Sequence, residues 1–213
     1  MRYSRGLRSR LLVLLLVGAL ATLPLASLSP REARASISIA VTYDVLLGAS
    51  NAIAVMTPLE QRAAWEDGRI TTRTRLRVDR AVAGDLITGG EVWIKTRGGV
   101  VGNVGQLVSG EPVFGVGKPY LMFVHGTRSG TLEVAARGQG QFTIEVDART
   151  SRRLLRSQTA EALVPPREAP PAPGARSPDA QPTGVLAADV LRDRELSDAC
   201  GKLATEWRAL HAR

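Results

Sequence analysis

Three arginines at alternate positions are the clearest chemical feature of this sequence. Arg73, Arg75 and Arg77 alternate with apolar and hydroxyl side chains, so a strand there would project all three from one face. A second alternating segment, residues 91–97, predicts a neighbouring strand whose outward side chains extend this face. Cations around an exposed tryptophan can bind a polyanion or an oligosaccharide. The candidate binding residues are therefore Arg73, Arg75, Arg77, Trp93, Lys95 and Arg97.

A solvated strand face is the simpler interpretation of the same residues. Glu60, Asp79 and Glu91 would then neutralise the arginines, and a C-terminal helix would cover Trp93. Aromatic residues make up only 4% of the chain, which leaves little for stacking against nucleic-acid bases. The sequence therefore favours the solvated face, and nucleic acid is not expected as a partner.

Catalytic chemistry has few candidate residues. The two histidines, His125 and His211, and the single cysteine, Cys200, do not make a plausible metal cluster. A nucleophile–base arrangement would have to be built around His125, which precedes a glycine and is interpreted as a turn residue. The glycine-rich segment 98–105 lacks the lysine of a phosphate-binding loop, and its valines are expected to be buried against a barrel. We therefore expect no cofactor, no metal and no enzymatic activity.

The net charge is concentrated near the N-terminus. The chain has 28 basic and 20 acidic side chains, a formal charge of +8, but residues 1–35 hold six arginines and one glutamate, which is +5. Four arginines precede the apolar run 11–21, and Ala33-Arg34-Ala35 has the pattern of a signal-peptidase site. We expect residues 1–35 to be a signal peptide, with an uncleaved anchor as the alternative. The mature chain would be exported to the periplasm or medium without a stable membrane anchor.

The folded part of the chain is expected to be mainly β, over residues 36–150. A short helix at 45–50, capped by Asp44, precedes several short strands separated by turns that contain glycine. A strand from Ala52 would continue past Pro58 with an irregularity there, and Asp67-Gly68 predicts a tight hairpin. These elements predict a small OB-like antiparallel barrel of five or six strands.

The remainder of the chain divides into a linker and a helix. Residues 151–183 are rich in proline and are predicted to be a disordered linker, and residues 184–213 to be an amphipathic helix. The apolar side chains of this helix should dock on the barrel, with a partner protein as the alternative. Cys200 lies among them as a small buried residue, and a dimer through it is less favoured. The predicted apolar face consists of Leu196, Cys200, Leu203, Trp207 and Leu210.

The element order and the segment GRITTRTRLRVDRAVAGD, residues 68–85, resemble the OB-like barrel of netrin-module domains. That family includes tissue inhibitors of metalloproteinases, and bacterial exported proteins of unknown function look similar. The resemblance spans roughly residues 44–146 and implies a protease-inhibitor-like module as an alternative function. Those inhibitors place an N-terminal cysteine on the protease zinc, whereas the expected mature chain begins near Ser36 and its barrel has no cysteine. The resemblance supports the fold and transfers no inhibitory residue, so we expect an exported, non-catalytic domain that binds an unknown protein or polyanion.

Overall fold

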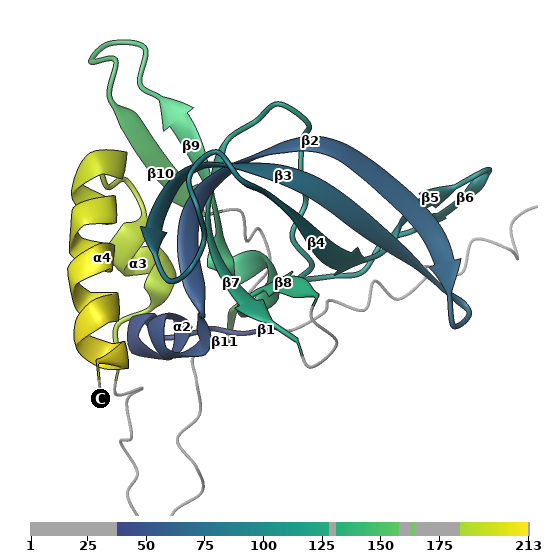
Figure 1. Cartoon of the computed structure of the whole chain (residues 1–213), viewed down its shortest axis with the longest axis horizontal. Coiled ribbons are helices and arrows are strands. Elements are labelled where there is room, and N and C mark those ends of the chain that lie inside the picture. The colour runs from purple at the N-terminus through teal and green to yellow at the C-terminus, as the bar shows by residue number, and fades with distance from the viewer. Residues whose placement is uncertain (1–37, 128–130, 158–162, 165–183, 213) are drawn as a thin grey trace, which may run out of the picture. The chain divides into compact units, whose positions relative to one another are not determined.

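The two longest strands of the sheet pair with each other in one long hairpin (Figure 1). β2, Ala52–Glu66, and β3, Arg69–Ala83, pair antiparallel on either side of the predicted turn at Asp67-Gly68. The register shifts beside Pro58, as predicted, because proline has no N–H to offer the ladder. The chain is described here by a computed structural model, which covers residues 38–127, 131–157, 163–164 and 184–212.

Five strands close into a barrel. β4, Glu91–Arg97, pairs with β3; β7, Tyr120–Gly126, pairs with β2; and β8, Leu132–Val134, joins β4 to β7. Among these five, only β4 and β8 are parallel, and the ring runs first, second, third, fifth, fourth in chain order. This arrangement confirms the predicted OB-like barrel.

β7 explains how the barrel is packed, because both of its faces are buried. Tyr120, Met122 and Val124 point into the barrel, together with Leu76 and Ile94. The alternate side chains belong to a second core between the outer surface of the sheet and the helices. This second core includes Leu46, Leu121, Phe123, Phe142, Leu155, Leu191 and Leu203.

Two further strands extend the sheet beyond the barrel. β9, Gln141–Val146, follows a 3-10 turn at Arg137–Gly140 and pairs with β7, and β10, Arg153–Ser157, pairs with β9. The predicted linker of 151–183 is therefore wrong for β10, whose Leu155 is fully buried in the second core. β11, Leu163–Val164, also falls in the predicted linker and pairs in parallel with β1, Ser38–Ile39. Residues 158–162 and 165–183 of that predicted linker lie outside the described residues, as does the predicted signal peptide.

Three helices cover one side of the extended sheet (Figure 1). α2, Tyr43–Ala49, begins after Thr42, so the predicted cap at Asp44 is wrong and that acid lies within the first turn. α3 is Ala187–Leu191, and α4 is Leu196–His211. The carboxylate of Glu195 accepts hydrogen bonds from the backbone N–H groups of Ser197 and Asp198 and so caps α4.

The apolar face of α4 docks on the chain's own sheet, as predicted. Leu196, Cys200 and Leu203 are buried in the second core, whereas Leu210 remains 42% exposed. Hydrogen bonds hold the C-terminal half of the same helix in place. The Trp207 indole donates to the Ser50 carbonyl at 3.0 Å, and the Tyr43 hydroxyl donates to Glu206 at 2.6 Å. Within the described part of the chain, no helix is long and apolar enough to span a bilayer.

Candidate functional site

The predicted arginine face exists, and acidic side chains pair with it. Arg73, Arg75 and Arg77 point to the outside of β3, as the alternation predicted. Each lies in an ion pair: Arg73 with Glu66 at 3.1 Å, Arg75 with Glu91 at 3.0 Å, and Arg77 with Asp79 at 2.7 Å. Arg75 also lies 3.4 Å from Glu60. Neutralisation by Glu60, Asp79 and Glu91 was the simpler of the two expectations, and the structure adds Glu66 to these acids.

Trp93 lies on this face and is covered by an arginine side chain instead of by the C-terminal helix. α4 packs on the outer surface over the start of β2 and over β7, β9 and β10, and its core includes no residue of β4, so the prediction that the C-terminal helix covers Trp93 is wrong. The Arg62 guanidinium lies over the indole instead, 5.1 Å from the ring centre. Arg62 also pairs with Glu60 at 2.8 Å. Lys95, the next candidate residue, pairs with Glu66.

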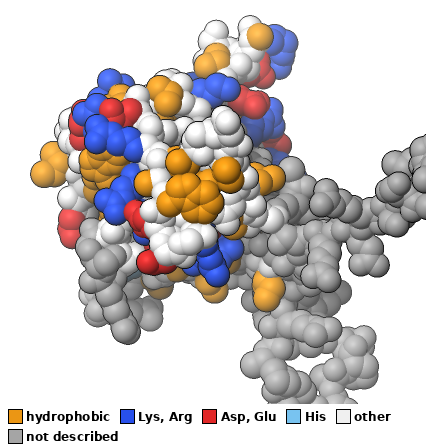
Figure 2. Space-filling view, turned by 90° about the vertical axis from the view of Figure 1, so that its right-hand side faces the viewer, with side chains coloured by type: hydrophobic (Ala, Val, Ile, Leu, Met, Phe, Trp, Pro, Cys, Tyr) orange, Lys and Arg blue, Asp and Glu red, His pale blue; other side chains and the backbone are white. Residues whose placement is uncertain are grey.

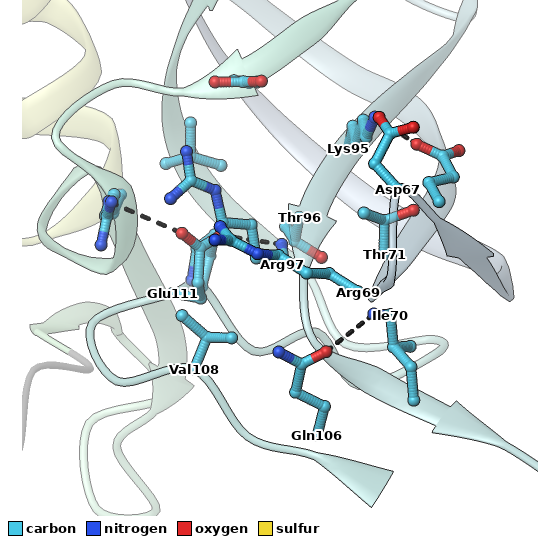
Figure 3. A pocket seen from close by; sticks show the side chains of 15 residues that line it. Asp67, Arg69, Ile70, Thr71, Lys95, Thr96, Arg97, Gln106, Val108 and Glu111 are labelled. Atoms are coloured by element: carbon cyan, nitrogen blue, oxygen red, sulfur yellow. Dashed lines mark hydrogen bonds and ion pairs between the residues drawn. The ribbon is translucent and has the colours of Figure 1, made fainter. Parts of the chain in front are cut away.

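The face ends in a hollow of about 670 Å³, which we call the charged hollow (Figure 3). Its walls come from the turn between β2 and β3, the end of β4, the end of β8, the segment 106–112 and the 3-10 turn. Four cations and four acids line it, so its formal charge is zero. The charged lining residues are Glu66, Asp67, Arg69, Lys95, Arg97, Glu111, Glu133 and Arg137.

Two of the four cations in the charged hollow have no ion-pair partner among the described residues, namely Arg69 and Arg97. Lys95 pairs with Glu66, and Arg137 lies 3.5 Å from Glu111. Figure 3 shows Arg69 and Arg97 extending into the middle of the hollow, whereas Asp67 lies beside Lys95 on the side away from Glu111. Guanidinium groups placed together in this way can bind both oxygens of an acid group.

Gln106, at the end of a two-stranded hairpin, forms the lower wall of the charged hollow. β5, Gly99–Val101, and β6, Val104–Gln106, pair with each other, so the predicted glycine-rich loop is a short sheet. Its valines are not buried as expected, because Val100 and Val104 project into solvent. Gln106 fixes the hairpin to the barrel by accepting a hydrogen bond from the Ile70 backbone N–H at 2.7 Å.

Glu111 connects two segments in the opposite wall of the charged hollow. Its carboxylate accepts a hydrogen bond from the Arg97 backbone N–H at 3.0 Å and pairs with Arg137, and its side chain is mostly buried. With both interactions in place, Glu111 fixes the end of β4 relative to the 3-10 turn. The Arg97 guanidinium itself is left directed at the hollow (Figure 3).

The pKa of the Glu66 carboxyl is lowered by its two cationic neighbours on the arginine face. The hydrogen bond from Lys95 is the main cause that lowers the pKa of Glu66, and the Arg73 charge adds to it. A lowered folded-state pKa stabilises the fold above the ordinary glutamate value of 4.5 and ceases to do so as the pH falls through the folded-state pKa.

We therefore expect Lys95→Met to raise the pKa of Glu66 toward its ordinary value. Carbon NMR titration of the glutamate carboxyls would measure this change. The stability difference between the variant and the wild type should shrink as the pH falls below 4.5. Lys118→Met removes an exposed lysine outside the face and is the control. An unchanged Glu66 titration in K95M would contradict the pairing.

The other chemically reactive residues lie apart from the charged hollow. His125 is half-buried in β7 opposite Glu133, and no hydrogen bond joins it to an acid or a hydroxyl side chain in the described ranges. His211 stacks on Trp207 at the end of α4. Cys200 lies on the buried face of α4, where burial raises the pKa of its thiol. No group of three or more potential metal ligands is found where the structure is described.

Comparison of the chain with protein families, with curated proteins and with solved structures found no match. The netrin-type relationship therefore remains a prediction.

Sequence reasoning found two of the six residues that organise this site. It identified Arg97 and Lys95 from the alternation of β4, but it missed Arg69, Gln106, Glu111 and Arg137. Arg69 follows the Asp67-Gly68 turn directly, so its position at the mouth of the hairpin was a usable signal. The other three come from irregular segments and a two-stranded hairpin, whose placement depends on tertiary contacts.

Proposed function

We propose that this chain is an exported, non-catalytic domain that binds a ligand through an acid group in the charged hollow. The observation that carries the proposal is the pair of guanidinium groups, Arg69 and Arg97, directed into one hollow without an ion-pair partner among the described residues. Export rests on the arginine-rich, apolar and small-residue pattern of residues 1–35.

The proposal narrows the earlier candidate site. Arg73, Arg75, Arg77 and Lys95 are already ion-paired, so a ligand would have to break those pairs to gain new ones. Arg69 and Arg97 require no such exchange. Hydrogen bonds between charged groups contribute about 1.5–3 kcal/mol each, so two free guanidiniums can hold a small acid weakly but specifically.

Binding of single small acids to the full-length mature chain tests this proposal. Butanoate, inorganic phosphate and glucuronate would be titrated while the backbone amides of residues 95–97, 69–70 and 106 are followed by NMR. We expect at least one of these acids to bind with a Kd on the order of millimolar. The double variant R69Q/R97Q should weaken that binding about tenfold or more.

Arg192→Gln is the matched control, because this exposed arginine at the end of α3 also lacks an ion-pair partner within the described chain and lies outside the hollow. It should leave the affinity unchanged. Equal binding by the wild type and R69Q/R97Q, or an equal loss in R192Q, would overturn the proposal.

A further inference from the structure

An apolar groove opens directly beside the charged hollow. It has a volume of about 410 Å³ and runs along the β5–β6 hairpin and the segment that follows it. The two cavities share Arg97, Gln106 and Glu111 in their common wall. The groove's own lining is mostly aliphatic side chains and glycine, and it includes Gly98, Gly99, Val100, Leu107, Val113 and Phe114.

Several large apolar side chains of this groove face solvent. Val100 is 67% exposed, Leu107 93% and Val113 66%. Figure 2 views the molecule from the side of the β5–β6 hairpin and shows hydrophobic side chains gathered together, with charged side chains around them. Contiguous apolar surface bordered by polar residues is typical of a binding site, because such surface is unfavourable in water.

The walls of the groove are held in place before any ligand arrives. The Val113 carbonyl accepts a hydrogen bond from Gln141 at 2.8 Å, and the Phe114 carbonyl accepts one from Gln61 at 3.2 Å. On the other wall, the Gly98 backbone N–H donates to the Ile70 carbonyl at 2.7 Å. The apolar side chains are therefore displayed on a fixed backbone, which reduces the entropy that a ligand must overcome.

We propose that the groove and the hollow together bind a single-chain anionic amphiphile, of which a fatty acid is the simplest example. The inference rests on the proposed function, since the acid group would lie at Arg69 and Arg97. The hydrocarbon chain would then lie across Val100, Leu107 and Val113, which are the exposed side chains next to Arg97.

A hydrocarbon chain suits this lining better than a peptide does. A buried methylene gains about 0.8 kcal/mol, whereas a peptide amide that enters an apolar groove without a hydrogen-bond partner loses more than that. An acidic head group is favoured next to the groove, because Arg97 lies in the wall that the two cavities share, whereas Asp67 and Glu133, the acids of the hollow without an ion pair among the described residues, do not line the groove.

Calorimetric titration of the full-length mature chain with butanoate, octanoate and dodecanoate, each below its micelle concentration, tests the inference. We expect affinity to rise roughly fourfold for each methylene that enters the groove, so dodecanoate should bind at least a hundredfold tighter than butanoate. Dodecyltrimethylammonium, with the same chain and a cationic head, should bind at least tenfold more weakly than dodecanoate.

Two exposed valines of the same loop provide matched variants. Val113→Asn introduces a polar group into the groove and should weaken dodecanoate binding about tenfold while butanoate binding stays the same. Val116→Asn changes a side chain that is 58% exposed and lies outside the groove lining, so it should have no effect.

The outcomes separate this inference from the function on which it rests. Arginine-dependent binding of butanoate without any gain from a longer chain would overturn the amphiphile and leave the acid site standing. Equal binding of the anionic and cationic amphiphiles, or equal losses in V113N and V116N, would also overturn it. Failure of every acid to bind in an arginine-dependent way would overturn both proposals.

Discussion

Leu203→Ala should lower the free energy of unfolding by about 2–5 kcal/mol, which is enough to remove a large part of the stability of a domain this size. Leu203 is fully buried in the second core, where α4 meets the sheet. Removing its branched side chain loses the transfer free energy of the buried methyl groups and leaves a cavity that a close-packed core fills only in part. Urea unfolding, followed by circular dichroism, measures the change.

Leu210→Ala makes the same chemical change seven residues later on the same helix. Leu210 remains partly exposed, so this variant should change stability by only about 0.5 kcal/mol. Leucine and alanine have similar helix propensities, so the comparison isolates burial at the interface. Similar losses in the two variants would mean that α4 is not docked on the sheet, and would favour the alternative that it binds a partner protein.

The contrast between these two leucines shows which aspects of burial the apolar periodicity of a helix predicts. The spacing of Leu196, Cys200 and Leu203 predicted one apolar face and a docked helix, and both predictions are confirmed. The same pattern placed Leu210 on that face, yet Leu210 lies beside Gly48 of α2, outside the second core, and remains partly exposed. Periodicity gives the direction of a side chain, whereas burial also depends on where the partner surface ends.

Strands were predictable where alternation or a turn motif marked them. The β2–β3 hairpin follows from Asp67-Gly68, and its outward arginines follow from period-two alternation. β10 was missed because Arg153–Ser157 is a short segment beside a proline-rich stretch, and its pairing with β9 is a tertiary contact. The charged hollow was missed as a unit for the same reason, since it is assembled from five separate segments.

Gly99→Ala should displace the β5–β6 hairpin and thereby disrupt both the charged hollow and the apolar groove. The backbone φ of Gly99 is +133°, which residues with a side chain rarely adopt, and a Cβ there would lie 2.3 Å from the Thr72 hydroxyl oxygen. That hydroxyl cannot move freely, because it donates to the Gly98 carbonyl at 2.7 Å. Backbone strain of about 1–2 kcal/mol and overpacking of about 1–3 kcal/mol together exceed what a hairpin of three residue pairs can resist.

The Ile70 amide provides a local measurement, because its N–H donates to Gln106 and is protected only while the hairpin is seated. Hydrogen exchange at Ile70 should accelerate at least tenfold in G99A, with butanoate binding weakened to a similar extent. Gly102→Ala is the matched control: Gly102 also has a positive φ, of +59°, but a Cβ there meets no atom within 4 Å. Equal acceleration in the two variants would mean that strain alone opens the hairpin; slow exchange in G99A would mean that the hairpin is not held against β3. The expected difference between them arises because the site's lower wall is fixed by a contact that only glycine permits.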